Sequence, residues 1–126
     1  MKITLMKFSN AIPFLSAKPF FKPAFSEKIH HELELVIKIN RVGKFIDKKF
    51  AHKYYENFTV GIDFTARDIQ DELKNKRLPW EKSKAFDFSA LIGKWFLKSQ
   101  FSNIDELDFK LLKNGKVTQE GNTNKM

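Results

Sequence analysis

Three acidic residues have the types and spacing to bind a divalent cation. Glu32 and Glu34 lie two positions apart in a segment of alternating polar and apolar residues, which predicts a strand. Side chains two apart on a strand share one face, about 6.8 Å apart along the backbone, so both carboxylates can converge on one ion. Asp63 ends a second apolar segment just before a predicted helix. Carboxylate oxygens are hard ligands, so this set favours Mg²⁺, Mn²⁺ or Ca²⁺ over zinc.

The strand that carries the two glutamates has an opposite, apolar face, formed by Leu33, Leu35, Ile37 and Ile39. A shift of one residue in strand register would bury both carboxylates, so this face determines which way they point. The same spacing also fits a solvated face with two ordinary glutamates. It does not by itself bring Asp63 to them, so both interpretations stay open. His30 and His31, which precede the strand, are interpreted as structural.

The elements that must position these residues are predicted to be strands and short helices in irregular order. Pro13, Pro19 and Pro23 each remove a backbone donor, so the first thirty residues should be extended and irregular. We predict strands at 32–39, 59–64, 108–112 and 116–119, and helices at 48–57 and 65–76. Residues 84–88 and 90–97 are predicted as strands or extended pieces, with a break at Gly93. Asn114 and Gly115 predict a hairpin turn because both tolerate positive φ. Without a regular alternation or an internal repeat, the fold class is α+β.

The helix predicted at 65–76 carries several polar residues close to the acids. Thr65 and Asp68 resemble a capping box with the shorter acid, so Asp68 is interpreted as a capping residue. Arg67 and Gln70 are three apart, share one helix face and can both reach a substrate near the acids. Arg67 can equally form a surface ion pair with Asp71, four residues on.

The composition fits one globular domain over residues 1–126. Hydrophobic residues make up 42% and charged residues 30% of the chain, which excludes a disordered or low-complexity protein. No apolar run approaches the roughly 20 residues of a membrane span, so no membrane association is expected. The lack of cysteine excludes disulfides and thiolate metal sites and makes the cytoplasm the default location. The net charge of +8 attracts polyanions and small acidic substrates alike, but it is spread without blocks, so nucleic-acid binding is not favoured.

Several ordered motifs run through the chain: HHELEL at 30–35, GIDFTARDIQ at 61–70, LPW at 78–80, KAFD at 84–87, NG at 114–115 and QEGNT at 119–123. Together they resemble the fumarylacetoacetate hydrolase family, and most closely its small acylpyruvase and oxaloacetate decarboxylase-like members. Such a series over about a hundred residues is far more specific than any lone motif. The resemblance implies a partial mixed β-roll or barrel with short flanking helices, and a homodimer.

The resemblance also implies roles: Glu32, Glu34 and Asp63 as ligands of Mg²⁺ or Mn²⁺, Lys84 as a catalytic cation beside the substrate, and Arg67 and Gln70 as substrate-binding residues. A 2-oxo acid chelates the ion through its carboxylate and the adjacent carbonyl oxygen. The ion and Lys84 then stabilise the enolate that forms when a carbon–carbon bond breaks or carbon dioxide leaves. Hydrolysis and decarboxylation share that enolate. From the residues alone, Lys84 can also be an ordinary surface lysine beside Lys82.

Two stretches of the family pattern are not found in this sequence. Small members begin with a glycine-arginine-asparagine-tyrosine-like motif and a helix whose His and Glu activate water, and they end beyond a glycine-threonine-proline loop. This sequence starts near the next motif, with Lys7-Phe8 where Lys-Pro is usual, and it ends at Met126, so both ends look truncated. Without that helix, hydrolysis would lack its general base. Two interpretations follow: a metal-dependent hydrolase or lyase of 2-oxo acids or acylpyruvates, and an inactive family remnant that serves as an oligomerisation or interaction module.

Overall fold

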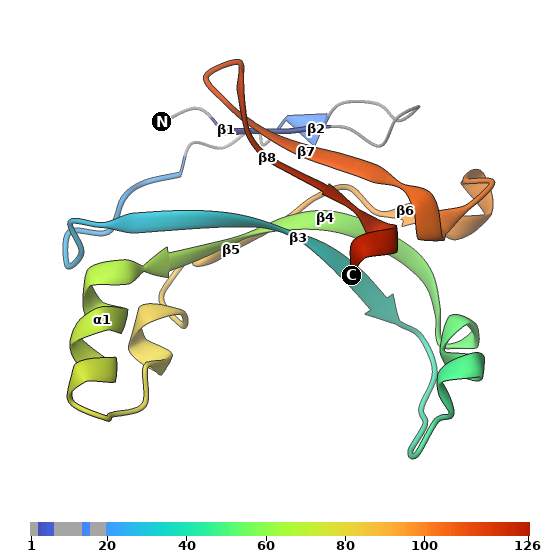
Figure 1. Cartoon of the computed structure of the whole chain (residues 1–126), viewed down its shortest axis with the longest axis horizontal. Coiled ribbons are helices and arrows are strands. Elements are labelled where there is room, and N and C mark those ends of the chain that lie inside the picture. Colours follow the sequence, from blue (N-terminus) through green and yellow to red (C-terminus); the bar gives the residue numbers. More distant parts are fainter. Residues whose placement is uncertain (1–2, 7–13, 16–19) are drawn as a thin grey trace.

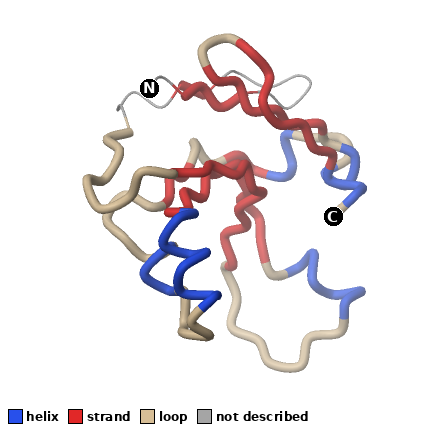
Figure 2. Tube along the Cα trace, turned by 60° about the vertical axis from the view of Figure 1, so that its left-hand side comes forward, coloured by secondary structure: helices blue, strands red, loops and turns tan. Residues whose placement is uncertain are grey.

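The fold consists of two antiparallel sheets and an α-helix, as seen in a computed structural model that describes residues 3–6, 14–15 and 20–126 (Figure 1). The first sheet has the strand order β2-β1-β7-β8, and the second has the order β3-β4-β5, with β6 also paired to β4. The first sheet covers one face of the second, and α1 lies on the opposite side in both views (Figures 1 and 2). The predicted α+β class is confirmed, and the described strands form open sheets rather than a closed barrel.

The strands of the described chain are β1 (Ile3–Met6), β2 (Phe14–Leu15), β3 (Ile29–Ile39), β4 (Tyr55–Ala66), β5 (Ala90–Ile92), β6 (Phe96–Leu97), β7 (Asp108–Lys113) and β8 (Lys116–Asn122). The α-helix α1 spans Arg67–Asn75, and 3₁₀ helices cover Lys48–Lys53, Glu81–Ser83, Lys98–Gln100, Ile104–Glu106 and Thr123–Lys125. None of these described helices is long and apolar enough to cross a membrane. Pro13 and Pro19, on which the predicted irregular start partly rests, lie outside the described residues.

The core lies between the two sheets. Its buried members are Leu33, Phe58, Val60, Ile62 and Phe64 of the second sheet with Leu107, Phe109 and Leu111 beside or within the first. Fully burying a side chain of this size contributes about 1.5–3 kcal/mol. The predicted apolar face of the glutamate-bearing strand is confirmed, since Leu33 is buried and Leu35 and Ile37 pack against the core. Ile39 is 65% exposed, where the β3–β4 register shifts after Lys38.

The predicted hairpin and the predicted break at Gly93 are both confirmed. Strands β7 and β8 pair antiparallel around Asn114 and Gly115, whose φ angles are 52° and 81°. Two successive positive φ angles are what a type I′ turn requires. Gly93 separates β5 from β6, and both short strands pair with β4.

The predicted helix at 48–57 is wrong in its second half. Asp47 caps a 3₁₀ helix over Lys48–Lys53, accepting a hydrogen bond from the N–H of Lys49, but β4 already begins at Tyr55. The long pairing of β4 with β3 includes Asn57 and Phe58, and Phe58 is completely buried. The strand predicted at 59–64 is accordingly longer, covering Tyr55–Ala66.

The strand or extended piece predicted at 84–88 is also wrong, because these residues form turns and bends after the 3₁₀ helix Glu81–Ser83. The helix predicted from residue 65 begins at Arg67, since Thr65 and Ala66 are still paired with β3. The capping box is therefore wrong as well. Ala66 occupies the N-cap position without a side-chain hydrogen bond, and Asp68 bonds elsewhere.

Candidate metal centre

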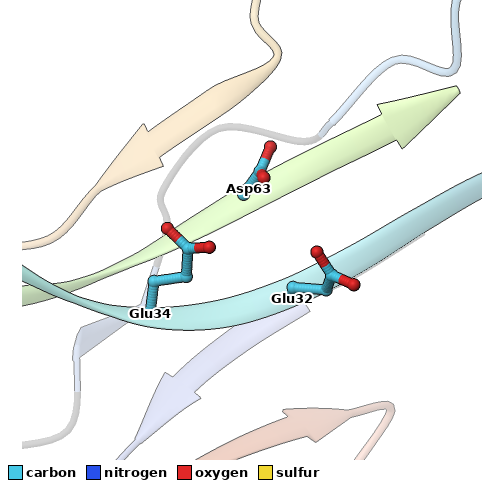
Figure 3. Close-up of side chains that lie close together, drawn as sticks. All are labelled: Glu32, Glu34 and Asp63. Carbon is cyan, nitrogen blue, oxygen red and sulfur yellow. The ribbon is translucent and has the colours of Figure 1, made fainter. Parts of the chain in front are cut away.

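The three acidic residues lie together on the face of the second sheet that is turned away from the core. Glu32 is paired with Asp63 across β3 and β4, and Glu34 is paired with Gly61. Paired residues of antiparallel strands share a face, so all three carboxylates project from the same side (Figure 3). One carboxylate oxygen from each residue lies within 4.8 Å of the others. The fold therefore brings Asp63 of β4 to the two glutamates of β3, which their spacing in the sequence left open.

The donor set fits a hard divalent cation. Mg²⁺ binds oxygens at about 2.1 Å, so its adjacent ligands are about 3 Å apart and opposite ones about 4.2 Å. Opposite ligands of Ca²⁺ are about 5 Å apart. The carboxylate oxygens, all within 4.8 Å of one another, need only small shifts to share one ion. The side chains of Glu32 and Asp63 are 48% and 25% exposed, which keeps the site open to a chelating ligand.

Gly61 lets neighbouring strands come close beside Glu34. A Cβ atom on Gly61 would lie 2.8 Å from Cγ2 of Val36 and 2.9 Å from the carbonyl oxygen of Leu91 in β5. Real Cβ atoms do not approach backbone oxygen so closely, so any larger residue would push β5 away from β4. The spacing of the strands that carry the acids thus depends on a glycine at this position.

Two cationic side chains contact the acids. Lys84 follows the 3₁₀ helix Glu81–Ser83, and its Nζ bonds to Oδ2 of Asp63 and lies 3.6 Å from Oε2 of Glu32. At the start of α1, Nη2 of Arg67 lies 3.2 Å from Oε1 of Glu32. Three carboxylates and two cations leave this cluster with one formal negative charge. The cationic side chains therefore offset most of the repulsion among the acids.

Gln70 completes the set of predicted site residues. It is the buried residue of α1, and its Oε1 accepts hydrogen bonds from Nη1 of Arg67 at 2.5 Å and from Nζ of Lys74 at 3.3 Å. The alternative ion pair between Arg67 and Asp71 does not occur within the described residues. Lys74 was not predicted at the site, although its position four residues after Gln70 places it on the same helix face.

The side chain of His30 orients the guanidinium of Arg67. Its Nδ1 accepts a hydrogen bond from Nε of Arg67 at 3.3 Å. His30 is paired with Thr65 across β3 and β4, so it projects from the same face as Glu32 and Asp63. That contact places His30 beside the acids, and its structural interpretation stays a prediction.

A family profile for the C-terminal domain of fumarylacetoacetate (FAA) hydrolase matches residues 3–126. The chain belongs to the fumarylacetoacetate hydrolase family. It is 35% identical over 108 residues to oxaloacetate tautomerase FAHD1, mitochondrial, of Rattus norvegicus, covering 86% of this chain and 49% of the relative. It is 37% identical over 108 residues to oxaloacetate decarboxylase, mitochondrial, of Dictyostelium discoideum, covering 86% and 50%.

Solved structures give the same family. A fumarylpyruvate hydrolase from Pseudomonas aeruginosa, in complex with Mn²⁺ and pyruvate, has a TM-score of 0.77 at 31% identity, covering 83% of this chain and 45% of that one. A yeast fumarylacetoacetate hydrolase family protein has a TM-score of 0.68 at 32% identity, covering 79% and 44%. The chain spans about half the length of the curated relatives it matches. The resemblance read from the sequence motifs is confirmed.

In this fumarylacetoacetate hydrolase family chain, α1 is tied to the segment that leads into β3. Oδ1 of Asp68 accepts a hydrogen bond from the hydroxyl of Ser26 at 2.6 Å, and Oδ2 accepts one from the N–H of Glu27 at 2.8 Å. The pKa of Asp68 is lowered to about 2, and the hydrogen bond from Ser26 is the main cause. Sequence reasoning missed Ser26, because a hydroxyl that bonds a carboxylate 42 residues away leaves no local pattern.

Proposed function

We propose that this chain carries the metal-binding and enolate-stabilising part of the catalytic domain of a divalent-metal-dependent enzyme acting on small 2-oxo acids or acylpyruvates. The observation that carries the proposal is the cluster of three carboxylates within 4.8 Å, two of which are contacted by Lys84. Relatives named for oxaloacetate and fumarylpyruvate support this substrate class.

Mg²⁺ is the proposed cofactor, and Mn²⁺ and Ca²⁺ are alternatives with the same preference for oxygen ligands. Glu32, Glu34 and Asp63 would hold the ion. When bound, the ion supplies a Lewis acid that polarises the carboxylate and the adjacent carbonyl oxygen of a 2-oxo acid. The Pseudomonas aeruginosa relative in complex with Mn²⁺ and pyruvate supports a divalent ion and a 2-oxo acid ligand.

Lys84 is the proposed catalytic residue. Its ammonium group contacts both Asp63 and Glu32, so it would also lie next to a 2-oxo acid bound at these acids. In the decarboxylation of oxaloacetate, the electron pair of the broken carbon–carbon bond moves onto the carbonyl oxygen as carbon dioxide leaves. A proton then adds to the carbon and gives pyruvate. Lys84 would stabilise the enolate oxygen between these two events, because a fixed positive charge acts most strongly where negative charge develops.

Arg67 and Gln70 are proposed to bind the carboxylate of the substrate. A guanidinium binds a carboxylate through two parallel hydrogen bonds, and here Gln70 and His30 hold the guanidinium of Arg67 in place. Decarboxylation needs no attacking water, so it requires fewer groups than hydrolysis does. Oxaloacetate is therefore the first substrate to test, before acylpyruvates and before tautomerisation.

Oxaloacetate decarboxylation by the purified chain tests the proposal. Treatment with EDTA should remove the activity, and Mg²⁺ or Mn²⁺ should restore it above the rate of the metal alone. Lys84→Met should abolish the activity. Lys82→Met is the matched control, since Lys82 is an exposed lysine two residues away, and it should stay active. Equal rates for wild type and Lys84→Met above the metal-only rate would contradict the proposal.

A second candidate function is an interaction module that forms a homodimer without catalysing a reaction. In the described chain β8 lies at one edge of the first sheet, and Phe21 and Phe88 are 82% and 81% exposed. Unpaired strand edges and exposed aromatic side chains are surfaces that a second copy can cover. Sizing chromatography with light scattering should show a dimer, and a monomer at every concentration would remove this candidate. The cytoplasmic location stays a prediction.

A further inference from the structure

The side-chain amide of Gln119 in β8 pairs with the backbone of Leu33 in β3. Its Oε1 accepts a hydrogen bond from the N–H of Leu33 at 2.7 Å, and its Nε2 donates one to the carbonyl oxygen of Leu33 at 3.0 Å. A primary amide offers the same donor and acceptor as a peptide group, so Gln119 takes the place of one residue of a neighbouring strand. Leu33 separates Glu32 from Glu34. Gln119 therefore holds the ligand strand between two of the three acids.

Strand β3 needs such a support because it lies at an edge. Within the described residues β3 pairs with β4 alone, so its other side has no strand neighbour. An edge strand presents a row of backbone N–H and carbonyl groups that have no partner strand. Leu33 is only 4% exposed, so its backbone N–H and carbonyl groups would be costly to leave without hydrogen bonds. The amide of Gln119 supplies both partners at that point.

A β-bulge in β8 directs Gln119 toward β3. Gln119 is paired with Leu111 of β7, whereas Val117, two positions earlier, is paired with Leu112, so Thr118 is an extra residue in β8. Leu111 is fully buried between the sheets, and its partner Gln119 shares its face. Bulges often re-aim a side chain next to a functional site. In this fold the bulge brings the amide to the core side of β8, where it reaches the edge of β3.

We propose that Gln119 is a positioning residue of the acidic cluster. It holds β3 at Leu33 so that Glu32 and Glu34 keep the separation that one cation needs. It acts through the backbone, because both of its hydrogen bonds go to Leu33 rather than to a carboxylate. The inference rests on the proposed function, since it assigns Gln119 a role in cation binding by that site. Outer partners that orient metal ligands typically change metal affinity 10–100-fold when they are removed.

Mn²⁺ titration of the full chain tests this role. The free ion is measured by its electron paramagnetic resonance signal. Gln119→Met removes both hydrogen bonds and keeps a side chain of similar volume. We expect the Mn²⁺ affinity to fall about 10–100-fold while circular dichroism shows a folded protein.

Thr123→Val is the matched control. The Thr123 hydroxyl accepts a hydrogen bond from the N–H of Leu107 and donates one to the carbonyl of Ile104, both at 2.8 Å. This variant also loses two side chain–backbone hydrogen bonds, but neither of them reaches β3. It should melt at a lower temperature and bind Mn²⁺ with wild-type affinity.

Each outcome decides the inference. Wild-type Mn²⁺ affinity in Gln119→Met overturns the positioning role and leaves the proposed function intact. Failure of the wild-type chain to bind Mn²⁺ overturns both. An equal loss of affinity in Thr123→Val would mean that general loosening weakens the site, and this also overturns the inference. If Gln119→Met does not fold, Gln119→Asn takes its place under the same criterion, because its amide is one methylene too short to make both hydrogen bonds.

Discussion

Replacing Lys84 with methionine should tighten the binding of a divalent cation while it removes catalysis. The Nζ of Lys84 bonds to Asp63 and lies 3.6 Å from Oε2 of Glu32. An ion about 2.1 Å from these oxygens lies at most about 6 Å from Nζ. At about 5 Å, a single and a double positive charge repel each other by about 1.7 kcal/mol in water and by about 7 kcal/mol at an effective dielectric constant of 20.

The lower figure is a lower bound for this site, because the side chains of Lys84 and Asp63 are only 29% and 25% exposed. Salt at physiological strength reduces it further, to about 1 kcal/mol. Lys84→Met should therefore bind Mg²⁺ or Mn²⁺ at least about fivefold more tightly, and more so at low salt. Isothermal titration calorimetry at two salt concentrations measures this, with Lys82→Met as the control. Equal or weaker binding would refute the reasoning and indicate that Lys84 mainly holds Asp63 in a ligating position.

Three further changes have expected outcomes. Glu34→Gln should lower Mn²⁺ affinity at least about tenfold by calorimetry and raise the melting temperature slightly in EDTA, since Glu34 has no ion pair within the described residues and its charge repels Glu32 and Asp63. Gly61→Ala should destabilise the chain by about 1–3 kcal/mol in urea denaturation, because its Cβ would meet backbone oxygen at 2.9 Å. Asp68→Asn tests a dependence on pH. The pKa of Asp68 is lowered to about 2, so its carboxylate contributes to the free energy of unfolding above about pH 4, and this contribution is lost as the pH falls toward 2. Allowing for solvent screening, the variant should lose about 1 kcal/mol at neutral pH and show a flatter acid limb in denaturation curves.

The strand that carries Glu32 and Glu34 could be predicted because its two faces differ in chemistry. The apolar residues at alternate positions must be buried, so the acids between them must project from the other face. The hairpin at Asn114 and Gly115 could be predicted for a similar reason, since both residues tolerate a backbone conformation that most others avoid. That Glu32 meets Asp63 could not be predicted without the β3–β4 register, because this register depends on the pairing of two whole strands.

Other features have no readable pattern. Phe50, Tyr54 and Phe58 recur at a spacing of four, which places residues on one side of a helix and also on one side of a strand. Only the pairing with β3 decides in favour of a strand from Tyr55 onward. The hydrogen bonds of Gln119 to Leu33 span 86 residues and depend on a bulge that no local signal predicts.

The cationic side chains of the cluster have two opposing effects on the acids. Each pair of carboxylates within 4.8 Å repels by about 1 kcal/mol even in water-like surroundings. Lys84 and Arg67 offset this repulsion through their contacts with Asp63 and Glu32. The same charges oppose a divalent cation that binds there. Lys84→Met should therefore be less stable than wild type in EDTA and gain more melting temperature from added Mg²⁺, because the stabilisation by a ligand rises with the logarithm of its affinity. If Mg²⁺ raises the melting temperature of Lys84→Met no more than that of wild type, the ammonium group and the ion do not compete.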